Sequence, residues 1–160
     1  MKSLLIIGAG GHGSVVAETA TVCGYEKIDF LDDNSPDAIG NTDQLEELQG
    51  FYDGVIVSIG NNEIRRELTH RIREVGAPMV SLIHPRSFIA VSAKIGAGSI
   101  VLPGAIVHSN AIIGSGCIIS IGALIDHDAV VEDFSHINTG AIVGAGKRAS
   151  GKIDAGEIIS

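Results

Sequence analysis

The feature that most constrains this chain is a repeat of six residues that runs from Ile89 to Val143. Helices repeat apolar residues about every 3.6 positions and strands every 2, so neither element accounts for a period of six. This period predicts a solenoid of short parallel strands, the hexapeptide β-helix. Every hexad has a branched aliphatic residue in the same place: Ile89, Ile95, Val101, Val107, Ile113, Ile119, Ile125, Val131, Ile137 and Val143.

If three hexads form one turn of a triangular prism, residues eighteen positions apart stack on one another. We therefore expect three ladders inside the coil, one of them through Ile89, Val107, Ile125 and Val143. Glycine, or a short polar residue, recurs three positions after most of the aliphatic residues, where a tight corner requires positive φ. These residues are Gly98, Gly104, Gly116, Gly122, Gly140 and Gly146, with Asn110 and Asp128. The remaining polar residues must face outward, where function is to be sought.

Composition narrows the class of protein. A formal net charge of −8 disfavours nucleic acid and anionic membranes as general partners. No apolar run is long enough to cross a bilayer, and residues 1–13 read as a first strand followed by glycines and not as a signal peptide. Cys23 and Cys117 are typical of reduced packing residues. We expect a cytoplasmic protein.

The first half of the chain alternates strands and helices. Apolar runs predict strands over residues 4–7, 27–31, 55–59 and 79–83, with helices over 15–23, after Thr42 and over 61–76. This order indicates a parallel sheet covered by helices, a half-sized Rossmann-like domain. We therefore predict an α/β domain over residues 1–84 and a β-helix over residues 85–160.

The α/β domain carries a glycine motif. Gly8, Gly10 and Gly13 match G-x-G-x-x-G between a strand and a helix, where backbone N–H groups bind phosphate. Asp32 and Asp33 follow about 20 residues later, where a carboxylate reaches a ribose hydroxyl. A turn needed only for packing is the alternative reading. Since only one mononucleotide-binding half precedes the repeat, a mononucleotide or nucleotide-linked sugar fits better than NAD.

The β-helix carries a second polar cluster, Asp126-His127-Asp128, at an outward corner directly after Ile125. A carboxylate beside a histidine fixes its tautomer and raises its basicity, which suits proton abstraction near neutral pH. His136 also points outward. The alternative is that an exposed corner tolerates any polar residue, and we read His108, one turn earlier, as mainly structural.

Several motifs together carry a family resemblance. The chain resembles bacterial sugar acyltransferases that join a small nucleotide-sugar-binding domain to a left-handed β-helix. That family includes the UDP-4-amino-sugar N-acetyltransferases of bacillosamine synthesis and the sialic-acid O-acetyltransferases. The matching segments are GAGGHG (8–13), FLDD (30–33), IGNNEIR (59–65), LIHP (82–85), IDHD (125–128) and EDFSH (132–136).

The resemblance implies a left-handed coil, a homotrimer with active sites between subunits, and acetyl-CoA as co-substrate with no metal ion. It implies His127 as general base, tuned by Asp126, and an amine that attacks the thioester directly. Residues that the resemblance assigns to the substrate are Gly8, Gly10, Gly11, His12, Gly13, Asp32, Asp33, Gly60, Asn61 and Ser120. Residues that it assigns to acetyl-CoA are His136, Gly144 and Gly146.

The sequence departs from the family pattern in three places. Ser120 stands where the family usually has asparagine, seven residues before the base. Ten residues instead of six separate Val143 from Ile153, so we expect residues 144–152 to bulge outward as a loop. The chain stops at Ser160 in mid-repeat, so we also expect it to lack the last coils, which solenoids use as a cap.

With these residues in place, the resemblance implies an acetyl-CoA-dependent N-acetyltransferase acting on the 4-amine of a UDP-linked deoxysugar for surface glycans. A sugar O-acetyltransferase, such as one acting on sialic acid, would use the same histidine on a hydroxyl group. A non-catalytic nucleotide-sugar-binding scaffold is the alternative outside the enzymes. A further interpretation, an NAD-dependent oxidoreductase, is supported by the glycine motif alone.

Overall fold

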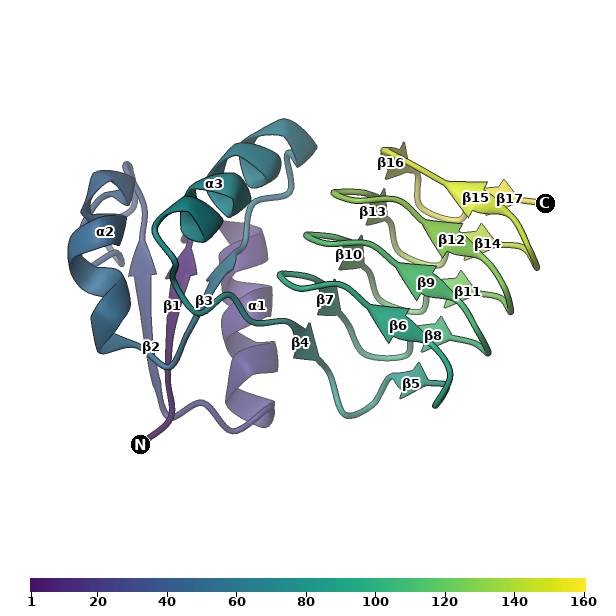
Figure 1. Cartoon of the computed structure of the whole chain (residues 1–160), viewed down its shortest axis with the longest axis horizontal. Helices are drawn as coiled ribbons and strands as arrows, with labels where there is room; N and C mark the ends of the chain where they lie inside the picture. The colour runs from purple at the N-terminus through teal and green to yellow at the C-terminus, as the bar shows by residue number, and fades with distance from the viewer. The chain divides into compact units, whose positions relative to one another are not determined.

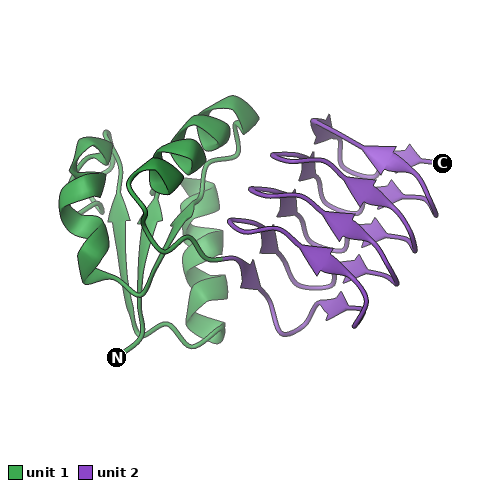
Figure 2. Ribbon diagram, in the orientation of Figure 1, with its two compact units in different colours: residues 1–80 green, residues 81–160 purple.

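The computed structural model describes all residues, 1–160, and divides the chain into two compact units, residues 1–80 and 81–160 (Figure 2). Unit 1 is an α/β domain with a three-stranded parallel sheet in the order β2-β1-β3. Its elements are β1 (Ser3–Ile7), α1 (Gly11–Val22), β2 (Lys27–Leu31), η1 (Thr42–Gln44), α2 (Leu45–Leu48), η2 (Gln49–Phe51), β3 (Gly54–Val57) and α3 (Asn62–Glu74). The expected α/β class is confirmed.

Alternating side chains of the sheet in unit 1 pack on two faces. Leu5, Ile7, Val55 and Val57 form a buried cluster with residues of α2 and α3, such as Ile72. The alternate residues of β1 face the other side, because successive side chains of a strand point in opposite directions. Helix α1 lies on the side of the sheet opposite α2 (Figure 1). The two faces of the sheet are therefore covered by different helices.

Unit 2 is a parallel β-helix built from two-residue strands in three sheets. The orders are β16-β13-β10-β7-β4, β17-β14-β11-β8-β5 and β15-β12-β9-β6. The strands are β4 (Leu82–Ile83), β5 (Phe88–Ile89), β6 (Lys94–Ile95), β7 (Ile100–Val101), β8 (Ile106–Val107), β9 (Ile112–Ile113), β10 (Ile118–Ile119), β11 (Leu124–Ile125), β12 (Val130–Val131), β13 (His136–Ile137), β14 (Ile142–Val143), β15 (Arg148–Ala149), β16 (Lys152–Ile153) and β17 (Ile158–Ile159).

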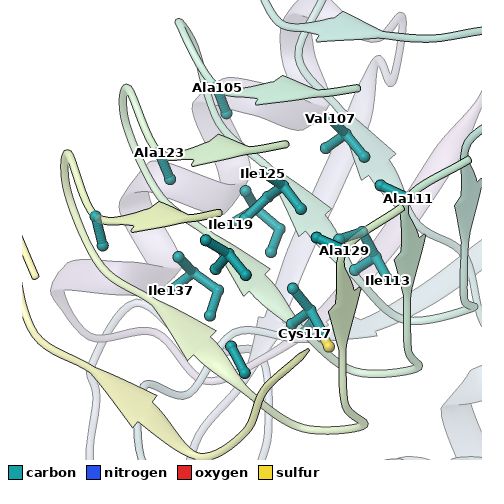
Figure 3. Packing of buried hydrophobic residues seen from close by; sticks show 14 of the residues in the cluster. Ala105, Val107, Ala111, Ile113, Cys117, Ile119, Ala123, Ile125, Ala129 and Ile137 are labelled. Carbon is teal, nitrogen blue, oxygen red and sulfur yellow. The ribbon is translucent and has the colours of Figure 1, made fainter. Parts of the chain in front are cut away.

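The predicted ladders are confirmed by the strand register. Ile125 pairs with Val107 on one side and Val143 on the other, each eighteen residues away. These side chains point into the coil and form one continuous buried cluster (Figure 3). The corners have positive φ as expected, including φ values of 59° at Asn110 and 60° at Asp128. The hexad period thus determines both the core and the outward positions.

Two expectations for the ends of the β-helix are corrected. The strand expected over residues 79–83 is divided: Met79 makes an isolated bridge to Val55, whereas β4 pairs with β7 of the β-helix. The expected outward loop over residues 144–152 is wrong, because Ala149 pairs with Val131 and continues the inward positions six residues after Val143. The register changes at the next corner, which is two residues shorter and contains Gly151 at φ 74°.

Candidate functional site

The glycine turn of unit 1 is shaped by hydrogen bonds from both neighbouring strands. Gly8 has φ 111°, and its N–H donates to the Leu31 carbonyl oxygen over 2.8 Å. The Ser58 hydroxyl donates to the Gly8 carbonyl oxygen over 2.5 Å. Helix α1 begins directly after the exposed Gly10, so its first N–H groups and its positive dipole end face the carboxyl end of β1. This turn suits a phosphate group.

The two expected ribose-binding carboxylates are engaged with the loops of their own unit. Asp32 accepts the N–H of Ala9 over 2.8 Å and the N–H groups of Asn34 and Ser35 over 2.8 and 3.0 Å. Asp33 accepts the N–H of Thr42 over 2.9 Å and its hydroxyl over 3.0 Å. Asp32 therefore ties the glycine turn to the loop after β2, a role that the sequence reading did not foresee.

Replacing Asp32 with asparagine is expected to lower the free energy of unfolding of unit 1 by about 1–3 kcal/mol at neutral pH. The amide oxygen can replace only one of the two carboxylate oxygens, and the amide nitrogen cannot accept the bonds made to the other. The N–H donors, first of all that of Ala9, hold the pKa of Asp32 below its ordinary value of 3.8. Because the pKa of Asp32 is lower in the folded chain than in the unfolded chain, its ionisation stabilises the fold at any pH above the unfolded-chain pKa. This stabilisation is lost as the pH falls through the folded-chain pKa.

The measurement for Asp32→Asn is urea unfolding followed by tyrosine fluorescence, since both tyrosines, Tyr25 and Tyr52, lie in unit 1 and the chain has no tryptophan. The difference from wild type should shrink in acid. Asp37→Asn, at an exposed position, serves as the matched control. An equal effect of both substitutions at pH 7 would contradict the prediction.

A pocket of about 290 Å³ lies beside this turn. Its apolar wall includes Leu31, Ile59, Ile64 and Leu68, and its polar lining includes Glu67 with the loop after β2. This mixture suits a nucleoside, whose base packs on aliphatic side chains while its hydroxyl groups donate to oxygen atoms. The pocket contains Gly8, Asp32 and Asp33 from the expected substrate-binding set.

The other expected residues of unit 1 lie at the starts of the two helices. Asn61 caps α3, and its Oδ1 accepts the N–H of Ile64 over 3.0 Å. The exposed Gly60 precedes it, and Gly11 and the buried Gly13 lie in the first turn of α1. His12 is half-buried, and its Nε2 atom is buried without a hydrogen-bond partner.

The charge state of His12 is set by its surroundings. Burial lowers the pKa of His12, and the positive charge of Arg65 lowers it further. A neutral imidazole at this position offers a hydrogen bond without a formal charge.

In unit 2, the corner after β11 carries the expected base. His127 is exposed, and its Nδ1 atom lies 2.8 Å from Oδ2 of Asp128. The hydrogen bonds from His127 and Asn110 lower the pKa of Asp128, so this carboxylate is ionised and Nδ1 must be the donor. The neutral ring then carries its available lone pair on Nε2. The bond to Asp128 is the main reason that the pKa of His127 lies above 6.5.

Asp126, the carboxylate expected to tune His127, contacts the backbone of His127 and not its ring. Its Oδ1 accepts the backbone N–H of His127 over 2.7 Å and lies 3.9 Å from Nδ1 of His108. Asp126 therefore acts on the His127 ring through its charge, whereas Asp128 holds the ring directly. The rings of His108 and His127 meet edge to face with centroids 6.5 Å apart, so His108 is part of this cluster.

Ser120 and His136 form a separate pair. The Ser120 hydroxyl lies 3.2 Å from Nε2 of His136, and Ser120 is buried whereas His136 is half-buried. They belong to the stack of β10 and β13, while His127 follows β11 in another sheet. Within one chain, the expected substrate residue Ser120 thus contacts the expected cofactor residue His136.

The turn after Val143 stacks directly on the His127 corner. The Gly146 N–H donates to the His127 carbonyl oxygen over 2.9 Å, and the Gly144 N–H donates to the Ile159 carbonyl oxygen over 2.7 Å. Both expected glycine amides are therefore used within the coil. Ala145 lies between them, is exposed, and its N–H donates to no group in the structure. This N–H is the donor that remains for a ligand.

Sequence comparison relates both units to known proteins. The PglD N-terminal domain model matches residues 3–72. The UDP-N-acetylbacillosamine N-acetyltransferase of Bacillus subtilis (strain 168) is 32% identical over 112 residues, or 64% of this chain. The chain spans about half, 52%, of that relative's length.

Solved structures extend the similarity to the whole chain. The acetyltransferase domain of PglB from Neisseria gonorrhoeae FA1090 matches with a TM-score of 0.90 and 33% identity, covering 100% of this chain and 92% of that one. The chain belongs to the PglD-like sugar N-acetyltransferases. The PglB domain has also been solved with acetyl coenzyme A, with a TM-score of 0.88, 33% identity and coverage of 97% and 89%.

A third relative is PerB from Caulobacter crescentus, solved in complex with CoA and GDP-perosamine. It matches with a TM-score of 0.86 and 26% identity over 100% of this chain and 89% of PerB. The predicted family resemblance is confirmed by these matches.

This PglD-like chain has site features that the sequence reading missed or weighted differently. Asp128 was read as a corner residue, although a carboxylate directly after His127 is itself a signal for a ring partner. His108 was read as mainly structural, although it stands eighteen residues before Asp126 and so stacks on it. Ala145 carries no side-chain signal, because its role depends on a backbone N–H.

Proposed function

We propose that this PglD-like chain transfers the acetyl group of acetyl-CoA directly to the 4-amino group of a UDP-linked amino-deoxysugar, in the synthesis of surface glycans. The observation that carries the proposal is His127, an exposed imidazole held by an ionised carboxylate, with its Nε2 lone pair available. The UDP-linked sugar in the name of the Bacillus subtilis relative and the acetyl coenzyme A bound to the PglB domain support the two substrates.

In the proposed mechanism, the sugar amine attacks the thioester carbonyl while Nε2 of His127 takes its proton. The C–N bond forms, and the oxyanion of the tetrahedral intermediate accepts a hydrogen bond from the Ala145 N–H. The C–S bond then breaks. The imidazolium returns the proton to the leaving thiolate, which gives CoA and the acetamido sugar. His136 with Ser120 and the turn of Gly144 and Gly146 would line the thioester and acceptor. No acyl-enzyme and no metal ion are needed.

The nucleotide end of the acceptor would bind in unit 1, which we propose as the nucleotide-sugar-binding domain. Its phosphates would lie on the 8–13 turn beside His12, and its nucleoside would fill the 290 Å³ pocket with Asp33, Gly60 and Asn61 at the rim. One three-stranded sheet offers one mononucleotide site, which disfavours NAD. Both substrates are cytoplasmic metabolites, which supports a cytoplasmic enzyme.

A homotrimer with active sites between subunits is part of the proposal. The outer face of the β17-β14-β11-β8-β5 sheet exposes an apolar column, with Phe88 55% and Ile158 62% exposed at its ends. A pocket of about 240 Å³ on this face is lined by Ile106, Leu124 and Ile142 and reaches His108 and Asp126. A second copy packed on this face would bury the column beside the His127 corner.

Among the helices of both units, none combines the length and the apolar character that a membrane span requires.

The test is release of free CoA thiol from acetyl-CoA with a UDP-4-amino-4,6-dideoxysugar as acceptor. We expect rapid release with the amine, and much slower release with the matching GDP-linked sugar or with sialic acid as a hydroxyl acceptor. Faster turnover of sialic acid would favour an O-acetyltransferase. Binding of UDP without thiol release from any acceptor would favour a scaffold and overturn the proposed activity.

A further inference from the structure

Arg65 in the first half of α3 is among the most buried side chains of the chain, with only 1% of its surface exposed. Its Nη1 donates to the carbonyl oxygens of Ile59 and Gly60 over 3.0 and 3.1 Å. Its Nη2 donates to Oδ1 of Asn62 over 2.7 Å. Burying a charged guanidinium costs free energy unless its N–H groups donate hydrogen bonds. The fold is therefore strongly favoured when Arg65 keeps these bonds.

These bonds fix the connection between β3 and α3, residues 58–61, and the first residue of α3. Arg65 holds its carbonyl oxygens from one side, while the Asn61 side chain holds the Ile64 N–H at the start of α3. Ser58, directly after β3, anchors the glycine turn through the Gly8 carbonyl oxygen. Since Ser58 is joined to Ile59 by the backbone, the segment that Arg65 holds is continuous with the residue that anchors the glycine turn.

This connection forms one wall of the unit 1 pocket. Ile59 and Ile64 line the pocket together with Leu31 and Asp32, whereas Arg65 is absent from its lining. By binding two carbonyl oxygens, the guanidinium also offsets their partial negative charge beside the turn that suits phosphate. A pocket whose wall is already ordered avoids the cost of ordering it when the ligand binds.

We propose that Arg65 is a positioning residue for the nucleotide: it holds residues 59–62 in the shape that binds the nucleoside diphosphate, without touching the ligand. This inference rests on the proposed function for the identity of the ligand. Because the acetyl transfer takes place elsewhere, Arg65 should affect the affinity for the nucleotide and leave the chemical step unchanged.

The experiment compares wild type with Arg65→Lys, Arg65→Met and the matched control Arg66→Met, in which a neighbouring exposed arginine of α3 is replaced. Titration calorimetry with UDP should show about 10- to 100-fold weaker binding for Arg65→Met, a smaller loss for Arg65→Lys and none for Arg66→Met. The KM for the UDP-sugar should rise in parallel, while kcat and the KM for acetyl-CoA stay at wild-type values.

A second readout is the NMR titration of His12, whose pKa is lowered mainly by burial and further by the positive charge of Arg65. This pKa should rise part of the way toward its ordinary value in Arg65→Met and stay low in Arg65→Lys. Unchanged UDP affinity in both variants, or a fall in kcat without a change in KM, overturns the proposal. If both Arg65 variants lose the far-UV circular dichroism of wild type, Arg65 is a folding residue and the proposal also fails. If wild type itself does not bind UDP, the proposed function fails instead.

Discussion

Replacing His127 with alanine is expected to lower kcat by about 10²- to 10⁴-fold, the usual contribution of a positioned general base. The KM values for both substrates should change little, because the His127 side chain is exposed and lies outside the buried core of the coil. Thiol release measured over a range of acetyl-CoA and UDP-sugar concentrations separates the two parameters. His70→Ala, which removes an exposed histidine of α3, is the matched control.

The pH profile tests the same residue without removing it. The base must be neutral, so kcat/KM should rise with pH through the pKa of His127, which lies above 6.5. In Asp128→Asn the hydrogen bond that favours the imidazolium is lost, so the pKa of His127 falls. The rise of kcat/KM with pH should therefore occur at lower pH. Asp126→Asn should move it less, because Asp126 acts on the ring through charge alone. Turnover near the wild-type level in His127→Ala would show that this histidine is not the general base.

The β-helix was predictable from the sequence because its core depends on a strict period. The inward residues recur every six positions, so both the ladders and the positive-φ corners follow from spacing alone. The prediction was wrong at residues 144–152, where the inward residue is small. Ala149 resembles the residues that fill the corners, so this part of the coil was predicted to be a loop. The strand over residues 82–83 was assigned to the wrong unit, because its apolar pattern does not specify a partner.

The candidate site was only partly predictable, because side-chain direction and hydrogen-bond competition are not encoded in spacing. His127 has a carboxylate on both sides, and only the geometry of the corner distinguishes Asp128 from Asp126 as the ring partner. Gly144 and Gly146 were expected to meet acetyl-CoA through their backbone amides, yet these N–H groups donate within the coil. Backbone groups become available or engaged only when the register of adjacent turns is known.

Replacing Gly13 with alanine is expected to abolish UDP binding in calorimetry, a loss of about 100-fold or more. A Cβ atom at Gly13 would lie 2.5 Å from the Gly8 carbonyl oxygen and 3.2 Å from its carbon, closer than real Cβ contacts allow. The turn cannot simply move away, because the same carbonyl oxygen accepts the Ser58 hydroxyl. Helix α1 must therefore shift relative to β1, which displaces the N–H groups proposed to bind phosphate.

The same shift should lower the free energy of unfolding of unit 1 by about 1–3 kcal/mol, the usual cost of overpacking. Tyrosine fluorescence in urea measures it, and Gly50→Ala is the matched control, because a Cβ at Gly50 meets nothing within 4 Å. Gly50→Ala should bind UDP like wild type. If Gly13→Ala is destabilised but binds UDP with wild-type affinity, the glycine serves packing alone and the phosphate must bind elsewhere in unit 1. Loss of binding with wild-type stability would instead indicate that the Cβ blocks the ligand directly.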